Sequence, residues 1–392
     1  HLKDSIAASH KDIAMVKRMK VTGTINLADF IMMRDSMPRL TALNLKDVRI
    51  KRLYSFISGG VEHWTDYAQD DALPASCLKG KKTLTSFVFP DVLKRINPGA
   101  FDGAGLTGSL NIPEGVVEIG ELAFANNDFT GILTLPSTLK KIDCWAFREC
   151  CFICSLNLPD GIEEIGDYCF YNCRNLYGKL ILPSHLKKMG SRAFDGCAGL
   201  KGDLVIPKSL TVIPSYAFYN CKFEGRLQLH DGITDLGYEA FYYNRFIGEL
   251  ELPKSLVALG GGNFEGNYFS GSFNIPKGLL SISSEAFADC TFTGEAEIPE
   301  GVTCIHENAF YNSKNLQKVI LPSSLELIDK NAFLDCKSLR VIECKSTIPP
   351  VVNDEAFNRV PLEDLTVIVP ESALNDYKSS ESWSGFKNII AK

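Results

Sequence analysis

Cysteines are the side chains of this sequence best suited by type to metal binding or redox chemistry. Thirteen occur, and Cys151 and Cys154 form a C-x-x-C pair with Cys144, Cys169 and Cys173 close by in the chain. A structural zinc site typically needs a second pair at matching spacing, whereas Cys169 and Cys173 form a C-x-x-x-C, with three residues between them. We therefore expect no metal site, while a local disulfide among these cysteines stays open as an alternative.

Catalytic motifs are the next chemistry to consider. His230 stands where other repeats of the chain carry proline, and His306 precedes an Ala-Phe pair, so both look like surface variants of repeat positions. Gly-x-Ser-x-Gly, His-Glu-x-x-His and phosphate-binding glycine loops are absent from the sequence. The sequence thus predicts a protein that is not an enzyme, with no catalytic residue and no cofactor.

Residues 51–76 concentrate aromatic and acidic side chains, among them Trp64, Asp66, Asp70 and Asp71. The three aspartates lack the Asp-x-Asp-x-Asp-Gly order of a calcium loop. We interpret the segment as an inserted loop whose aromatic residues fold back onto the chain. The alternative is a carbohydrate-binding or enzyme-like role centred on Trp64, because long loops are often functional.

The elements that position these side chains are repeats. A phenylalanine, usually preceded by alanine, recurs at steps of 23 or 24 residues from an initial leucine; the anchors are Leu78, Phe101, Phe124, Phe147, Phe170, Phe194, Phe218, Phe241, Phe264, Phe287, Phe310, Phe333 and Phe357. A fixed period of this size predicts a solenoid in which each turn buries its apolar face against the next.

Each period has the same internal order. Three residues after the anchor comes Cys or Asn, and we expect these residues to form an internal ladder. A phenylalanine or leucine and then a glycine follow. The period continues with an apolar-x-apolar-Pro tetrad, such as Leu110 to Pro113, and a second apolar pair, such as Leu139 and Ile142. Alternation of apolar and polar residues in the tetrad predicts a short strand ended by the proline. The periodic cysteines are explained by the ladder, so most are expected to be free thiols.

This pattern resembles the BspA-like, or Treponema-type, leucine-rich repeats, whose sequence is close to C/N-x-x-L-x-x-I-x-L-P-x-x-L-x-x-I-G-x-x-A-F. The segment from Asn315 to Phe333 matches it almost position by position, and the resemblance covers about residues 74–370. It implies a bacterial, secreted or surface-anchored protein that binds without catalysis. The fold expected is a right-handed leucine-rich-repeat superhelix, mainly short β-strands and turns.

Four regions are predicted along the chain. Residues 1–50 form an N-terminal cap with a helix begun by Asn26, and 51–76 are the inserted loop. Residues 77–360 hold about thirteen repeats, and 361–392 close the far end with a strand, a short helix and aromatic side chains. Caps are needed because an open solenoid end exposes its core and strand edges.

Two rows of surface residues are the candidate binding sites. The outward positions of the tetrads, which we call the tetrad face, are expected to form a continuous ribbon that carries Arg226, Glu249, Glu251, Glu295 and Glu297. The second row lies beside the anchors and is called the tyrosine row: Trp145, Tyr168, Tyr171, Tyr216, Tyr219, Tyr242, Tyr243 and Tyr311. Tyrosines suit interfaces, but these rings could equally stack on one another and cover the anchors, and the acidic residues could be solvated surface.

Composition sets the remaining expectations. A net charge of −6 argues against nucleic acid as a partner. The sequence contains no run of about 18 apolar residues, so it predicts no membrane span. The first residues do not resemble a signal peptide, so any export signal is expected to lie outside this sequence. We expect a monomer that is secreted or held at the cell surface. Its expected partner is another protein or a component of the host matrix.

Overall fold

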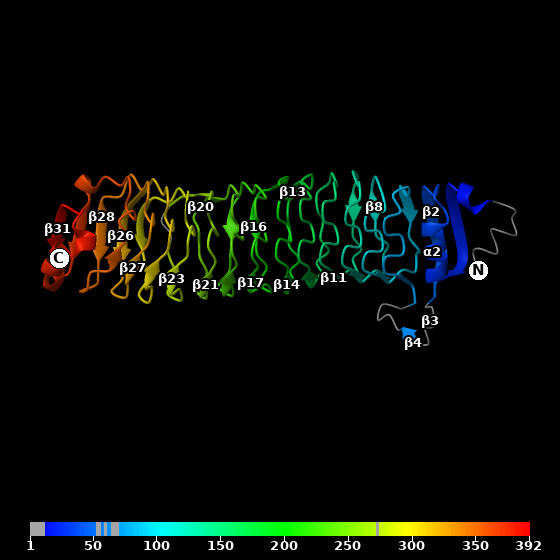
Figure 1. The fold of residues 1–392 in the computed structure, drawn as a ribbon, viewed down its shortest axis with the longest axis horizontal. Helices are drawn as coiled ribbons and strands as arrows, with labels where there is room; N and C mark the ends of the chain where they lie inside the picture. Colours follow the sequence, from blue (N-terminus) through cyan, green and yellow to red (C-terminus); the bar gives the residue numbers. More distant parts are fainter. Residues whose placement is uncertain (1–11, 52–55, 59–60, 64–69, 272–273) are drawn as a thin grey trace. The chain divides into compact units, whose positions relative to one another are not determined.

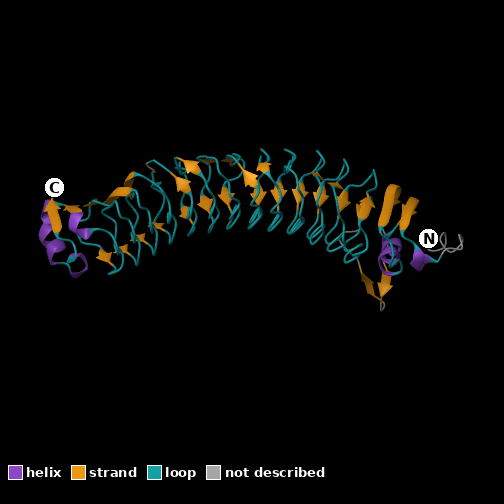
Figure 2. Ribbon diagram, turned by 90° about the horizontal axis from the view of Figure 1, so that it is seen from above, coloured by secondary structure: helices purple, strands orange, loops and turns teal. Residues whose placement is uncertain are grey.

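The computed structural model describes residues 12–51, 56–58, 61–63, 70–271 and 274–392. The chain divides into two compact units, residues 1–199 and 200–392. Within each unit, successive turns of the chain lie side by side (Figure 1). Strands occupy short pieces of each turn and loops form the rest (Figure 2). The predicted leucine-rich-repeat solenoid is confirmed.

The N-terminal part of the first unit combines strands with one helix. A 3-10 turn, η1 (Ile13–Met15), precedes β1 (Arg18–Ile25), α2 (Leu27–Asp35) and β2 (Ala42–Ile50). Asn26 caps α2 by accepting from the Ala28 N–H, and the Asp29 carboxylate accepts from the Asn26 N–H. This reciprocal capping box satisfies amides that the first helical turn leaves unpaired. The predicted cap at Asn26 is confirmed, and the helix ends at Asp35.

Strands β1 and β2 pair in parallel, and β2 pairs in parallel with β6 (Ser86–Val88). Between them in sequence, β3 (Phe56–Ser58) and β4 (Val61–His63) form an antiparallel hairpin within the predicted inserted loop. The candidate Trp64 of that loop lies outside the described residues.

The second apolar pair of each repeat, rather than the tetrad, builds the more continuous strand ladder. In the first unit six strands pair in parallel in the order β14-β12-β11-β9-β7-β5. Their bounds are Ala72–Leu73 (β5), Arg95–Ile96 (β7), Glu118–Ile119 (β9), Lys141–Ile142 (β11), Glu164–Ile165 (β12) and Lys188–Met189 (β14).

The second unit has the same ladder in two parallel sheets, β17-β19-β21 and β23-β25-β27-β29. The bounds are Val212–Ile213 (β17), Asp235–Leu236 (β19), Ala258–Leu259 (β21), Ser281–Ile282 (β23), Cys304–Ile305 (β25), Leu327–Ile328 (β27) and Val351–Val352 (β29).

The tetrads pair only in places. In the first unit β8 (Leu110–Asn111) pairs with β10 (Leu133–Thr134); in the second, β16 (Leu204–Val205) pairs with β18 (Leu227–Gln228). The longest tetrad sheet follows the order β24-β26-β28-β30-β31. Its strands are Gly294–Glu297 (β24), Leu316–Leu321 (β26), Val341–Cys344 (β28), Thr366–Val369 (β30) and Asn388–Ala391 (β31).

Residues 156–158, 180–182 and 250–252 are described but lie in no strand. The prediction that the tetrad face is one continuous ribbon is therefore wrong. A tetrad offers few ladder hydrogen bonds because the proline that usually ends it has no N–H. The phenylalanine anchors and the ladder of second apolar pairs hold the turns together without these bonds. The corner before the tetrad contributes β13 (Gly178–Lys179), β15 (Leu200–Lys201), β20 (Ile247–Gly248) and β22 (Tyr268–Phe269); β13 pairs with β15, and β20 pairs with β22.

The core of each unit is a stack of the predicted phenylalanine anchors. In the first unit the rings of Phe124 and Phe147 are parallel at 5.6 Å, and in the second those of Phe310 and Phe333 are parallel at 5.2 Å. All four rings are fully buried. A second, shorter stack runs beside the first, as between Phe223 and Phe246 at 5.5 Å. Offset stacking adds to the burial of apolar area that holds consecutive turns together.

The predicted Cys/Asn ladder is also confirmed. The Asn244 amide donates to the Phe218 carbonyl, one turn earlier, at 2.8 Å, and the Cys173 thiol reaches the Phe147 carbonyl at 3.1 Å. Ser313 makes the same contact with the Phe287 carbonyl at 3.2 Å. One donor per turn thus satisfies a buried carbonyl that no strand covers.

The C-terminal elements contact the last repeat of the second unit. Three 3-10 turns, η2 (Leu362–Asp364), η3 (Glu371–Ala373) and η4 (Glu381–Trp383), flank β30 and α3 (Leu374–Ser379). The Tyr377 hydroxyl donates to the Ser346 carbonyl at 3.1 Å, and the Trp383 indole N–H donates to the Pro350 carbonyl at 2.9 Å. Among the described residues, no helix has the length and apolarity that crossing a bilayer requires.

Candidate functional site

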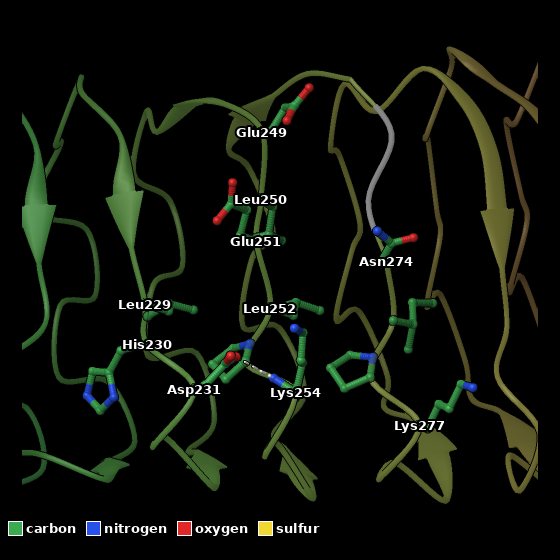
Figure 3. Close-up of a pocket in the computed structure, with 13 residues that line it drawn as sticks. Leu229, His230, Asp231, Glu249, Leu250, Glu251, Leu252, Lys254, Asn274 and Lys277 are labelled. Carbon is green, nitrogen blue, oxygen red and sulfur yellow. Dashed lines mark hydrogen bonds between the residues drawn. The ribbon is translucent and has the colours of Figure 1, made fainter. Parts of the chain in front are cut away.

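Three of the predicted site residues lie together on the tetrad face of the second unit. Arg226, Glu249 and Glu251 line one hollow of about 630 Å³, and Glu249 and Glu251 also line a larger one of about 890 Å³. The two hollows share Leu229 as well, so they form a single depression, which we call the groove. Figure 3 shows its larger part, crossed by the turn that carries Glu249 to Lys254.

The groove forms where the tetrad ladder is interrupted. On one side β18 pairs with β16, but among the described residues no backbone hydrogen bond joins 227–230 to 249–252. The turns stay in register because Ile247 at the preceding corner donates to the Gly225 carbonyl at 3.0 Å. The adjacent tetrads are thus tied at their corner and unpaired along their length.

The floor of the groove is apolar and its rim is charged. Leu250, Ile275 and Pro276 are buried, while Leu229 and Leu252 are half-buried at the surface of the depression. Glu249, Glu251, Lys254 and Lys277 are exposed around them. An apolar surface with polar groups at fixed places is the usual character of a binding site.

His230, at one end of the groove, has a structural role. Its Nε2 lies 3.0 Å from the Pro207 carbonyl and 3.1 Å from the Leu210 carbonyl, and its Nδ1 accepts the Gly232 N–H at 3.0 Å. These partners hold the proton on Nε2 and leave neither ring nitrogen available to abstract one. The imidazole therefore joins two turns where other repeats carry proline.

The four glutamates predicted as one acidic surface fall into two environments. Glu295 pairs with Lys318 at 3.1 Å and Glu297 with Lys345 at 2.7 Å, so lysines of the following turns neutralise them. Among the described residues, no ion pair involves Glu249 or Glu251. The carboxylates that remain for a partner are therefore those of the groove.

The tyrosine row of the second unit is a stack of rings. Tyr219 and Tyr242 are parallel at 4.9 Å, and Tyr242 and Tyr243 lie 4.9 Å apart. Tyr216 and Tyr243 have left-handed backbone, with φ of 60° and 53°, and such residues flank the anchors in turn after turn. Tyr243 remains half exposed, and the Lys222 ammonium lies 5.1 Å from its ring centroid. The rings of the tyrosine row stack on one another, which was one of the two interpretations drawn from the sequence. The row also remains partly exposed at Tyr243.

A carboxylate cluster beside this row was missed by the sequence analysis. Burial, and then the negative charges of Glu285 and Asp289, raise the pKa of Glu265 to about 7, although a hydrogen bond with Tyr242 acts in the opposite direction. The cluster was not evident because its members come from different turns and share no motif. Only the period, applied to acidic residues at three fixed offsets from the anchors, could have found it.

In the first unit the tyrosine row is shorter. Trp145 stacks on Tyr168 at 5.6 Å, and Tyr168 meets Tyr171 edge-on at 5.5 Å. The Arg192 and Arg148 guanidinium groups lie 5.9 Å from the ring centroids of Tyr168 and Tyr171 respectively. These rings pack with one another and with the protein's own cations.

The cysteines make no catalytic or metal site in the part of the chain that the structure describes. All thirteen are free thiols, and among the described residues no cluster of His, Cys, Asp or Glu is placed to hold a metal ion. Burial raises the pKa of the Cys173 thiol to about 12. Thiols of this kind stay protonated and are poor nucleophiles. Cys304 is half-buried, with its sulfur 3.5 Å from Nδ1 of His306.

Sequence reasoning also missed several residues that line the groove. Lys254 and Lys277 line it together with the predicted glutamates. Lys254 and Lys277 each directly follow the proline of a tetrad. That position could have been read from the repeat alignment, since it comes to the end of the tetrad face in every turn.

Comparison with known proteins agrees with this architecture. The chain matches the model of the BspA type leucine rich repeat region over residues 71–201, 174–270, 201–292 and 264–378. No curated protein matches the chain.

Among solved structures, the chain is similar to a leucine-rich repeat protein from Bacteroides ovatus, with a TM-score of 0.58, 20% identity and coverage of 96% of this chain and 91% of that one. It also matches a leucine rich cell surface protein from Faecalibacterium prausnitzii with a TM-score of 0.41, 20% identity and coverage of 78% and 84%. At such identities the likeness concerns the fold alone. The family match spans most of the sequence and every anchor from Phe101 to Phe357, and we conclude that the chain belongs to the BspA-type leucine-rich-repeat family.

Proposed function

We propose that this protein is a non-catalytic binding protein, secreted or held at the cell surface, and that it engages another protein through the groove of the second unit. The observation that carries the proposal is the pair of exposed carboxylates, Glu249 and Glu251, on the rim of an apolar depression. Neither has an ion-pair partner among the described residues, in contrast to Glu295 and Glu297.

The class of partner follows from the fold and the charge. Repeat solenoids present extended surfaces built from successive turns, which suit macromolecules better than small substrates. Two unpaired carboxylates favour a partner with lysine or arginine at its contact surface and accelerate encounter with it. A protein of the host extracellular matrix is the partner we propose, with the protein acting as a monomer.

The experiment measures binding of the purified protein to a panel of immobilised extracellular-matrix proteins at two salt concentrations. Glu249→Gln with Glu251→Gln should weaken binding several-fold and reduce its salt dependence. The matched control is Glu295→Gln with Glu297→Gln, which removes the same formal charge from carboxylates already paired with lysines; it should change binding little. Circular dichroism checks that both variants fold.

Two results would count against the proposal. Failure of the unmodified protein to bind any member of the panel would reject matrix binding. Binding that survives the Glu249 and Glu251 changes but is lost on Tyr219→Ala with Tyr242→Ala would place the interface at the tyrosine row and make the groove glutamates solvated surface.

A further inference from the structure

The groove of the second unit has ends of opposite charge. Figure 3 shows Glu249 and Glu251 toward one end and Lys254 and Lys277 toward the other, on either side of the leucine floor. All four side chains line the depression and are exposed. Among the described residues, no ion pair involves any of the four, so neither end is neutralised by the other.

Neighbouring charged groups reduce but do not cancel this polarity. Arg226 lies at the acidic end, with its side chain beside Gly248, and leaves one net negative charge there. At the basic end Asp231 leaves one net positive charge, and its Oδ1 is already engaged by the Lys254 backbone N–H at 3.0 Å. The His230 ring is held by the contacts described above.

The floor between the two ends suits an extended chain. Among the described residues, no backbone hydrogen bond is made by 249–252. Glu249 and Lys254 are five residues apart in the sequence, and the turn after the tetrad begins at Lys254; five residues of fully extended chain span roughly 16 Å. A bound peptide in extended form covers the same distance with the same number of residues.

We propose that the groove binds one extended segment of the partner protein that carries lysine or arginine at one end and aspartate or glutamate at the other, about five residues apart. The cationic side chain meets Glu249 and Glu251, the carboxylate meets Lys254 and Lys277, and small or apolar side chains lie over Leu229 and Leu252. This inference rests on the proposed function and specifies the partner's contact segment.

The test uses four short fluorescent peptides with blocked termini and the same central Ser-Val-Ser segment. One has a pair of lysines before the centre and a pair of glutamates after it; the second has lysines on both sides and the third glutamates on both sides. The fourth has the composition of the first with lysine and glutamate mixed on each side. Fluorescence anisotropy with the unmodified protein should show the first peptide binding several-fold more tightly than the other three.

A charge change in the protein makes the test sharper. Lys254→Glu with Lys277→Glu turns both ends of the groove acidic, and the preference should move to the peptide with lysines on both sides. Both lysines are exposed, so the variant is expected to fold, and circular dichroism verifies it. An unchanged order of preference in this variant, or equal binding of the first and fourth peptides to the unmodified protein, would overturn the inference.

The outcome separates this inference from the proposed function. If no peptide shows the expected preference but the matrix partner still loses affinity on Glu249→Gln with Glu251→Gln, the groove binds its partner without a dipolar segment. If the partner is insensitive to those changes as well, the proposed function fails together with the inference.

Discussion

At the scale of single residues, the position three after each anchor ties consecutive turns together. Asn244 is a fully bonded example, like Asn127 and Asn267, since its amide donates to the carbonyls of Phe218, Phe241 and Tyr242 and its Oδ1 accepts the Phe223 N–H at 3.3 Å. At this position the Cys173 thiol and the Ser313 hydroxyl each donate to the preceding anchor's carbonyl. The asparagine turns should therefore be the more sensitive to substitution.

Asn244→Ala should lower the free energy of unfolding by about 3 kcal/mol, because it leaves several buried backbone groups without a partner. Asn244→Cys, which supplies the thiol found at this position in other turns, should lose about half as much. Urea unfolding followed by circular dichroism measures both. Equal losses for the two variants would mean that the hydrogen bonds of this position add little to its packing.

Glu265 makes the stability of the second unit depend on pH. Its pKa in the folded protein, about 7, lies above the ordinary value of 4.5 because the carboxyl is partly buried and faces Glu285 and Asp289. The folded state therefore holds a proton that the unfolded chain releases, and stability falls as pH rises from about 4.5 through 7.

Glu265→Gln should consequently stabilise the protein at pH 8 by about 1 kcal/mol, a value reduced for the solvent exposure of the group, and have little effect near pH 5. Thermal melts across this range measure the difference. Glu251→Gln, on the tetrad face, is the control and should show no such trend. A constant difference between Glu265→Gln and the unmodified protein at all pH values would contradict the proton linkage.

At the scale of elements, α2 is held to the first repeats by a buried lysine. The Lys81 ammonium donates to the Arg34 carbonyl at 2.9 Å and to the Met37 carbonyl, both at the C-terminal end of α2. In return the Arg34 guanidinium donates to the Ser76 carbonyl at 3.0 Å. Because unpaired carbonyls and the helix dipole make this end negative, a cation there stabilises the helix.

Lys81→Met should keep the apolar stem but release α2 from the repeats, at a loss of about 2 kcal/mol in local stability. Hydrogen exchange read by mass spectrometry should show faster exchange in residues 27–50, with the second unit unchanged. The control is Lys82→Met, an exposed neighbour. If both variants exchange like the unmodified protein, the cap is held by apolar packing alone.

The tetrad and the second apolar pair of a turn differ in how regularly they pair with the neighbouring turn. The second apolar pair forms a ladder in both units, whereas tetrads pair only in places, as in β8 with β10, β16 with β18 and the longer strands β24 and β26. An unpaired tetrad loses little stability because the ring stacks and the other ladder already fix the turn. The groove is the consequence that matters for binding.

At the scale of the whole molecule, one repeat of 23 or 24 residues builds both units of the chain. The sequence predicted the features that depend on local chemistry or on a strict period. These are the anchors, the Cys/Asn ladder, the Asn26 cap and the C-terminal aromatic residues Tyr377 and Trp383. A solenoid turn contacts mainly its neighbours, so the pattern of one turn predicts the packing of the next.

What the sequence alone determined is the class of fold, the buried face of each turn and the absence of any recognised catalytic motif. Only the tertiary structure decided which tetrads pair, that Glu295 and Glu297 are neutralised while Glu249 and Glu251 are not, and that Glu265 gathers carboxylates from other turns. The physical reason is distance: hydrogen bonds and ion pairs between turns depend on spacings of a few tenths of an ångström and on side-chain direction, and a repeat period specifies neither.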